Sequence, residues 1–120
     1  RRLVYLSSSM HRGGGTDLGG LERADASYSD TKLWVTALSL ALAARWPEAS
    51  IHSVDPGWVP TRMGGASAPD DLEQGHLTQT WLATHDPDAP RTGGYWHHRR
   101  SQFQDALLAA LELRTGVALP

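Results

Sequence analysis

Tyr28 and Lys32 are the two residues whose types and spacing most directly suggest chemistry. They lie four positions apart, so on a helix both side chains project from one face and can share a site. A phenol has an ordinary pKa of about 10, and a nearby ammonium stabilises its deprotonated form, which makes a tyrosine usable as an acid or base near neutral pH. A chance pairing is the alternative, but Lys32 is the only lysine beside ten arginines. Because arginine is no equivalent compact donor, we interpret the pair as catalytic.

A cluster of hydroxyls, Ser7, Ser8 and Ser9, follows directly on a short apolar run. The run, Leu3–Leu6, is typical of a buried strand, and its serines would lie at the carboxyl end of that strand. When hydride reaches a carbonyl carbon, negative charge develops on the oxygen, and two hydroxyl donors placed there would stabilise it. The serine cluster therefore supports a catalytic role for Tyr28.

The elements that position these residues alternate between strand and helix. The first strand is Leu3–Leu6, and a second is predicted at Ile51–Val54. Between them the glycine-rich stretch Gly13–Gly20 is predicted to be a surface loop, and a helix is expected from about Asp25 until Pro47 ends it. Strand, helix and strand in this order predict a βαβ crossover in a parallel sheet.

The rest of the sequence predicts two more helices and one more strand. Ser67 is the expected N-cap of a helix that runs to about Thr84, because Asp70 and Asp71 in its first turn suit the helix dipole. The third strand is expected at Gly94–His98, and the last helix at Phe103–Arg114, ended by Gly116. Residues 1–120 are thus predicted to be a single partial domain, half of an open α/β sheet with about three strands and three helices.

With these elements in this order, the sequence resembles the C-terminal, catalytic half of a short-chain dehydrogenase/reductase. The resemblance covers nearly all of the chain and rests on three motifs in family order: the strand Arg2–Ser8, Tyr28-x-x-x-Lys32 at a helix start, and Asp-Pro-Gly-Trp-Val-Pro-Thr at 55–61. Residues 93–100 and the final helix are similar to bacterial retinol-dehydrogenase-like and daunorubicin-ketoreductase-like members. The resemblance implies a Rossmann-like, doubly wound parallel sheet. It also implies an oxidoreductase that transfers hydride between NAD or NADP and a carbonyl or alcohol.

The resemblance also implies a role for each motif residue. Ser8 would orient and polarise the substrate carbonyl, with Ser9 as the reserve choice. Tyr28 would give a proton to the carbonyl oxygen or take one from an alcohol, and Lys32 would lower the Tyr28 pKa and hydrogen-bond the nicotinamide ribose. The implied cofactor contacts are Tyr28, Lys32, Pro56, Gly57, Val59 and Thr61, with glycine at 57 because a side chain there would hold the backbone away from a flat ring. Trp58 and Met63 would line a hydrophobic substrate pocket or, equally, pack in the core.

The sequence departs from the family pattern on its N-terminal side. Family members begin with a strand and a Thr-Gly-x-x-x-Gly-x-Gly turn that leads into the pyrophosphate-binding helix, and no such turn occurs here. We therefore expect the N-terminal half of the fold to be missing and residues 1–120 alone to be inactive. The choice between NAD and NADP, and the substrate, stay open. The alternative function is a non-enzymatic, truncated module that acts in protein interaction.

Composition excludes other classes of protein. Eleven Lys and Arg against 13 Asp and Glu give a net charge of -2, so nothing favours binding to nucleic acid. The absence of cysteine excludes disulfides, thiolate metal sites and cysteine nucleophiles. No apolar run approaches the roughly 18 residues of a membrane span, and we expect a cytoplasmic protein. The expected partner is a small carbonyl or alcohol, with a homodimer or homotetramer open for the full-length protein. No metal is expected, since His97 and His98, as neighbours in a strand, should point to opposite faces.

Overall fold

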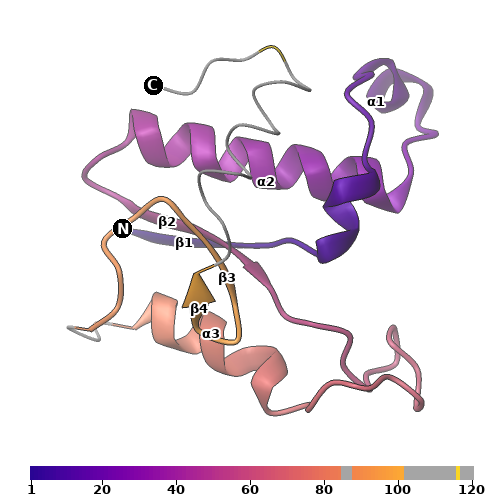
Figure 1. The fold of residues 1–120 in the computed structure, drawn as a ribbon. Coiled ribbons are helices and arrows are strands. Elements are labelled where there is room, and N and C mark those ends of the chain that lie inside the picture. Colours follow the sequence, from indigo (N-terminus) through magenta and orange to yellow (C-terminus); the bar gives the residue numbers. More distant parts are fainter. Residues whose placement is uncertain (85–87, 102–115, 117–120) are drawn as a thin grey trace.

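A computed structural model of the chain describes residues 1–84, 88–101 and 116. Its centre is a four-stranded sheet in the order β1-β2-β3-β4, in which β1, β2 and β3 are parallel and β4 is antiparallel to β3 (Figure 1). In the register of the parallel strands, Leu3 lies opposite Ile51 and Ser53 opposite Tyr95. The strands are β1 (Arg2–Leu6), β2 (Ser50–Asp55), β3 (Gly94–His97) and β4 (Arg100–Ser101).

The three predicted strands and the parallel α/β arrangement are confirmed, whereas β4 was not predicted. Strand β4 has only two residues, and the turn before it places His98 and Arg99 in the left-handed region, with φ of 48° and 62°. Two-residue hairpin turns of this kind usually carry Asn or Gly. Because neither residue type occurs at this turn, no local sequence signal predicts the hairpin.

Two helices cover opposite faces of the sheet (Figure 1). Helix α2 (Tyr28–Arg45) begins with a capping box: the Ser27 side chain accepts from the Asp30 N–H, and the Asp30 carboxylate accepts from the Ser27 N–H. It ends just before Pro47, as predicted. On the other face lies α3 (Gln74–Ala83).

The structure corrects two predicted segments and does not describe a third. The predicted loop at 13–20 instead contains the end of a short 3-10 helix, η1 (Ser9–Gly13), and the start of a short helix, α1 (Gly19–Arg23), which begins where the Asp17 carboxylate accepts the Gly19 N–H at 2.9 Å. Ser67 is not a helix N-cap, because α3 begins only at Gln74. The predicted helix 103–114 lies outside the described residues.

The interface between α2 and the sheet combines small apolar clusters with buried hydroxyls. Leu33 packs with Leu40, and Ile51 with Ala43 and Ala49. Beside these clusters Ser39 of α2 hydrogen-bonds Ser53 of β2, and Thr36 of α2 hydrogen-bonds Ser7 at the end of β1. Buried hydroxyls must be paired, because an unpaired one costs about 1–3 kcal/mol. The sheet is therefore joined to α2 by directional bonds as well as by apolar contact.

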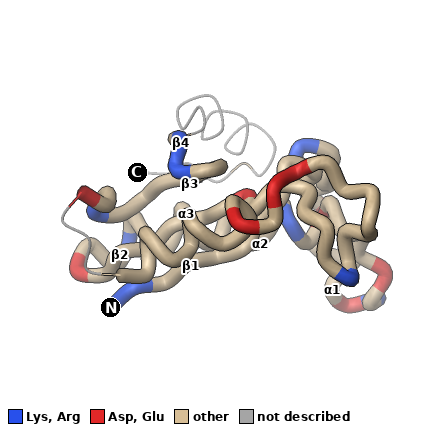
Figure 2. Tube along the Cα trace, turned by 90° about the horizontal axis from the view of Figure 1, so that it is seen from below, with Lys and Arg blue, Asp and Glu red and all other residues tan. Residues whose placement is uncertain are grey.

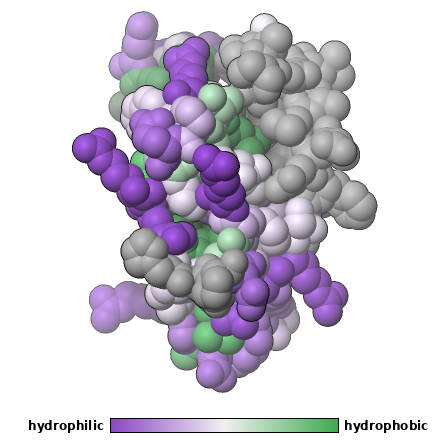
Figure 3. Space-filling model, turned by 90° about the vertical axis from the view of Figure 1, so that its left-hand side faces the viewer, coloured by the Kyte–Doolittle hydropathy of each residue, from purple (hydrophilic) through white to green (hydrophobic). Residues whose placement is uncertain are grey.

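The charged residues lie mostly outside this interface. Figure 2 shows acidic and basic residues spread over loops and element ends, while the parallel strands β1, β2 and β3 and helix α2 are largely uncharged. Figure 3 looks onto the end of the sheet at which the parallel strands begin, where hydrophilic side chains stand out between smaller apolar areas. Among the described residues, no helix has both the length and the apolar character that crossing a membrane requires.

His52, in the middle of β2, makes the stability of this fold sensitive to pH. It is buried, and its Nδ1 accepts hydrogen bonds from the Gly94 N–H at 3.1 Å and from the Trp96 indole N–H at 3.2 Å. This nitrogen therefore carries no proton in the folded state. Burial, aided by the charge of Arg2, lowers the pKa of His52.

We expect the free energy of unfolding to fall as the pH drops through about 6.5, the ordinary histidine pKa. In that range the unfolded chain takes up the proton while folded His52 still resists it. His52→Asn retains an acceptor for the Gly94 N–H but does not titrate, so chemical denaturation from pH 7.5 to 5 should show a weaker pH dependence than the parent chain. Equal dependence in the two proteins would contradict the role of His52.

Candidate functional site

The carboxyl end of β1 and the first turn of α2 meet at Lys32. The Lys32 ammonium donates a hydrogen bond to the Leu6 carbonyl at 2.9 Å, and it lies 5.4 Å from the centre of the Tyr28 ring. The Tyr28 side chain is exposed, so a ligand can reach it. Two of the predicted catalytic residues therefore lie together at the edge of the sheet where catalytic sites of open α/β folds are commonly built.

Ser8 directly follows the end of β1 and serves as the N-cap of η1. Its hydroxyl oxygen accepts from the Met10 N–H at 3.2 Å, and its backbone is extended, with φ of -164° and ψ of 149°. A hydroxyl has one proton to donate besides its lone pairs. The cap uses a lone pair, so the Ser8 proton stays available to a substrate oxygen.

A close backbone contact joins η1 to the start of α2. A Cβ added at Gly14 would lie 2.5 Å from the Ser29 carbonyl oxygen and 2.6 Å from the Leu33 Cβ, so only glycine fits at this position. The adjacent Gly15 N–H donates to the Asp30 carboxylate at 2.7 Å. This bond, followed by those from Ser27, lowers the pKa of Asp30. The segment that carries Ser8 is thereby held against the helix that carries Tyr28 and Lys32.

Buried polar groups lie beneath this junction. Thr36 donates to the Lys32 carbonyl at 2.7 Å, so its oxygen accepts from the Ser7 hydroxyl at 2.5 Å. Tyr95 of β3 is buried, and this burial, together with the negative charge of Asp55, raises its pKa to about 12. The Tyr95 phenol is therefore protonated at any physiological pH and acts as a fixed hydrogen-bonding group.

The end of β2 lies beside the end of β1, because the Ser7 N–H donates to the Val54 carbonyl at 2.7 Å. The chain then turns at Pro56 and Gly57, where the Asp55 carboxylate accepts the Gly57 N–H at 2.9 Å. Gly57 has φ of +85°, a conformation that strains other residues. A Cβ there would also lie 2.6 Å from the Asp70 carboxylate. The fold itself therefore requires glycine at this position, for which the sequence suggested only contact with a cofactor as the reason.

Two anchors hold the segment that follows this turn. The Asp70 carboxylate accepts the Trp58 N–H at 2.5 Å, and the Asp70 N–H donates to the Trp58 carbonyl at 3.0 Å. The Val59 side chain packs over Gly75, at the second position of α3, where a Cβ would approach it to 2.9 Å. Asp70 was expected to stabilise a helix start around Ser67, and that prediction was wrong because its carboxylate instead binds the Trp58 backbone.

The remaining predicted site residues lie on the surface. Trp58 is 59% exposed and Met63 is 80% exposed, so the alternative that they pack in the core is wrong. The Trp58 indole donates to the Gly64 carbonyl at 2.9 Å, and the Thr61 hydroxyl accepts the Gly64 N–H at 3.1 Å. Ser9 is exposed at the start of η1. These residues remain available to a ligand.

His97 and His98 were expected to point to opposite faces of a strand, and that prediction was wrong. Their rings stack, with centroids 3.8 Å apart, because His98 leaves the strand in the left-handed conformation. His97 instead bonds the Asp55 backbone carbonyl, with 3.1 Å between its Nδ1 and the oxygen. Across the described part of the chain, no group of three or more His, Asp or Glu side chains is placed to hold a metal ion.

The sequence did not reveal several residues that shape this site. Asp70, Thr36, Tyr95 and His11 come from four separate segments, and each reaches its hydrogen-bond partner only in the folded structure. Thr36 had one usable signal, since it interrupts the longest apolar stretch of the chain on the side of α2 that faces the sheet. The other three had no local pattern that distinguishes them from surface residues.

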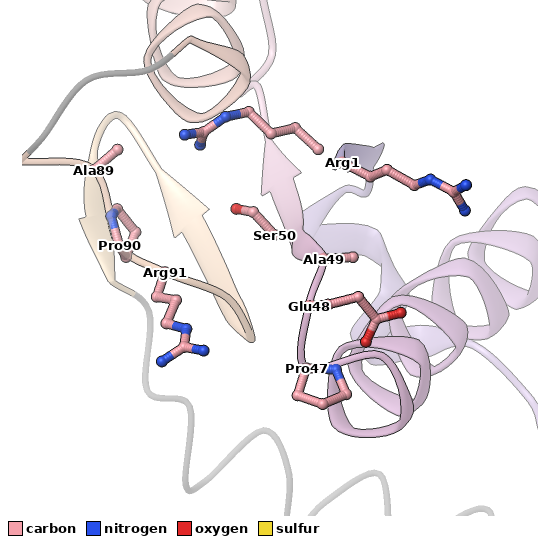
Figure 4. A pocket seen from close by; sticks show the side chains of 9 residues that line it. Arg1, Pro47, Glu48, Ala49, Ser50, Ala89, Pro90 and Arg91 are labelled. Atoms are coloured by element: carbon pink, nitrogen blue, oxygen red, sulfur yellow. The ribbon is translucent and has the colours of Figure 1, made fainter.

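A cavity of about 530 Å³ lies at the opposite end of the sheet (Figure 4). Although it has three arginines in its wall, the labelled side chains of Arg1 and Arg91 point away from one another and do not converge on a common centre. None of the predicted site residues lines it. Its lining residues are Arg1, Arg2, Pro47, Glu48, Ala49, Ser50, Ala89, Pro90 and Arg91.

Comparison with known proteins finds relatives of one kind. No family model matches the chain. A short-chain dehydrogenase from Gibberella zeae is 32% identical over 140 aligned residues, which include 100% of this chain and 54% of the relative. Carbonyl reductase [NADPH] 1 of Oryctolagus cuniculus is 38% identical over 71 residues, 54% of this chain and 26% of that protein. Among solved structures, the carbonyl reductase Sniffer of Drosophila melanogaster superposes with a TM-score of 0.56 at 26% identity, over 83% of this chain and 39% of Sniffer.

The chain spans about half the length of the Gibberella protein that it matches. The curated relatives are fungal and animal proteins, so they do not support the expected likeness to a bacterial branch of retinol-dehydrogenase-like or daunorubicin-ketoreductase-like members. The Sniffer superposition confirms the expected Rossmann-like architecture for the part that this chain covers.

Proposed function

Because this chain belongs to the short-chain dehydrogenase/reductase family, we propose that it forms the catalytic part of an oxidoreductase that transfers hydride between a nicotinamide cofactor and a carbonyl or alcohol. The observation that supports this proposal best is the position of the Lys32 ammonium, 5.4 Å from the Tyr28 ring and bonded to the end of β1. That arrangement places a phenol, an ammonium and the Ser8 hydroxyl on neighbouring segments at one edge of the sheet.

In the proposed reaction each residue has a distinct task. The Ser8 hydroxyl donates a hydrogen bond to the substrate oxygen. Its proton is available because the Met10 N–H uses only a lone pair of the Ser8 oxygen. The Tyr28 phenol gives the proton that balances hydride arrival during reduction and takes it back during oxidation, and Lys32 stabilises the charge on the phenol oxygen. The cofactor supplies the hydride when it is bound.

The residues that would hold the nicotinamide are Lys32 and the segment after β2: Pro56, Gly57, Val59 and Thr61. The fit is supported by the glycine at 57, which leaves the turn without a side chain, and by the two anchors at Trp58 and Val59 that fix its backbone. One relative is named as an NADPH enzyme, which supports a nicotinamide dinucleotide, NAD or NADP, as the cofactor. We expect the substrate to be a small apolar ketone or alcohol, bound near Ser9, Trp58 and Met63.

The test of this proposal uses the full-length product of the gene. This protein should oxidise NADPH or NADH in the presence of at least one member of a panel of ketones and aldehydes. The loss of absorbance of the reduced nicotinamide measures the rate. Residues 1–120 alone should be inactive, because their sequence offers no Gly-rich turn for the pyrophosphate. If neither cofactor is consumed with any carbonyl, or formed with any alcohol, the oxidoreductase proposal fails and the interaction module is favoured.

A further inference from the structure

His11 lies one turn beyond Ser8 in η1, and none of the roles proposed above uses it. Its side chain is buried, with 3% of its surface exposed, although the segment around it is otherwise largely open to solvent. A polar ring is buried in a small domain only where its hydrogen bonds compensate for lost hydration. The bonds of His11 therefore indicate what it does.

Two of those bonds end on Ser8. The Ser8 carbonyl accepts from the His11 backbone N–H at 3.0 Å and lies 2.6 Å from the His11 Nδ1. A carbonyl oxygen can only accept, so the His11 Nδ1 must carry a proton. The side chain thus donates to the backbone of the residue proposed to polarise the substrate, and this fixes the tautomer of the ring.

The ring is held in turn by Tyr95. The two rings are in edge-to-face contact, with centroids 5.2 Å apart at an angle of 63°, and Tyr95 is as deeply buried as His11. The Tyr95 oxygen lies 3.4 Å from the same His11 Nδ1. Because that nitrogen already carries a proton, the phenol can act toward it only as an acceptor.

The support beneath Tyr95 leads back to α2. The side chain of Tyr95 interacts with that of Ser7, the Ser7 hydroxyl bonds Thr36, and Thr36 donates to the Lys32 carbonyl. The backbone of Ser8 is thereby connected, through His11 and Tyr95, to the helix turn that presents Tyr28 and Lys32. A continuous set of buried groups joins the two halves of the proposed site.

We propose that His11 is a positioning residue that fixes the Ser8 backbone, and so aims the Ser8 hydroxyl at the substrate oxygen beside Tyr28. The expected effect on kcat rests on the proposed function. The hydrogen bond from the His11 Nδ1–H to the Ser8 carbonyl can be tested without it. Misplacement of a reacting group by about 1 Å can cost 100-fold in rate.

The kinetic test compares three variants. His11→Leu fills the space without a donor and should lower kcat by roughly 10- to 100-fold with little change in the KM for the cofactor. His11→Asn restores an N–H donor at a similar distance from the backbone and should recover most of the loss. His52→Leu removes a second buried histidine, remote from Ser8, and should cost stability without lowering the kcat of the folded protein.

A double variant separates this role from general structural damage. If His11 acts through Ser8, then Ser8→Ala and the combined Ser8→Ala, His11→Leu protein should have the same kcat, because the second change has nothing left to misplace. Independent, multiplicative losses would overturn the proposal. If Ser8→Ala alone leaves kcat unchanged, the proposed role of Ser8 fails, and the inference about catalysis fails with it.

A spectroscopic arm needs no activity at all. Nitrogen-15 spectra should show the neutral His11 ring protonated on Nδ1, and amide hydrogen exchange at His11 should quicken about tenfold or more in His11→Leu but not in His52→Leu. A ring protonated on Nε2, or unchanged exchange in His11→Leu, would overturn the positioning role even in a fully active enzyme. An inactive protein with the expected spectra would instead count against the oxidoreductase proposal alone.

Discussion

Replacing Tyr28 by phenylalanine is expected to lower kcat by roughly 100- to 10,000-fold, the usual contribution of a positioned proton donor. The substitution removes only the hydroxyl. The aromatic ring remains to contact the Lys32 ammonium, and the side chain is exposed in the first turn of α2, so neither packing nor the capping box is disturbed. Steady-state kinetics with the gene's full protein product, together with a thermal unfolding curve, measure both consequences.

Tyr5→Phe is the matched control for this experiment. Tyr5 lies within β1, where it packs partly buried against the cluster around Ile51, and it has no part in the proposed site. This variant should retain the parent turnover. If Tyr28→Phe also retains turnover, Tyr28 is not the proton donor and the mechanism proposed for this fold must be given up.

Gly14→Ala is expected to lower both stability and turnover, although it adds a single methyl group. The new Cβ would lie 2.5 Å from the Ser29 carbonyl and 2.6 Å from the Leu33 Cβ, and neither a helix backbone nor a Cβ can move aside cheaply. Overpacking of this kind typically costs about 1–3 kcal/mol. Because the added methyl group would push η1 away from α2, we also expect kcat to fall by roughly 100-fold as Ser8 moves away from Tyr28.

Gly13→Ala isolates the steric cause. A Cβ at Gly13 meets nothing closer than the Ser29 hydroxyl at 3.8 Å, an ordinary contact. Gly14 itself has φ of -72°, which alanine adopts freely, so backbone strain cannot explain a loss at that position. Chemical denaturation and kinetics of the two variants should therefore diverge; similar values for both would show that the approach of η1 to α2 is not tightly constrained.

The elements that were predicted correctly are those whose signals are local. The apolar runs at 3–6 and 51–54 and the stop at Pro47 depend on neighbouring residues alone, and the structure contains the corresponding strands and helix end. Helix α3 was misplaced because its apparent first-turn acid, Asp70, is used by the backbone of Trp58, twelve residues earlier. No local pattern distinguishes a capping carboxylate from one that binds a distant loop.

The same distinction holds within the site. The spacing of Tyr28 and Lys32 is local, and their proximity on one helix face followed from it, whereas the helix begins at Tyr28 and not at about Asp25 as predicted. By contrast, hydropathy alone does not predict which side of α2 is buried, since Leu38 is 49% exposed while Thr36 is 0% and Ser39 is 1% exposed. These hydroxyls are buried because Ser7 and Ser53 lie opposite them, which only the folded sheet reveals.

The hydroxyl pairs between α2 and the sheet have a consequence for how far the helix can slip. Apolar side chains tolerate a small lengthwise slide, because their contacts are non-directional. The Ser7–Thr36 and Ser39–Ser53 bonds do not, since a displacement by the 1.5 Å rise of one residue would break both. These bonds therefore fix the position of the helix along its own axis. Enlarging or trimming its leucines should change the stability of its packing on the sheet, whereas removing both hydroxyl pairs would allow the helix to slide and move Tyr28 past the end of β1.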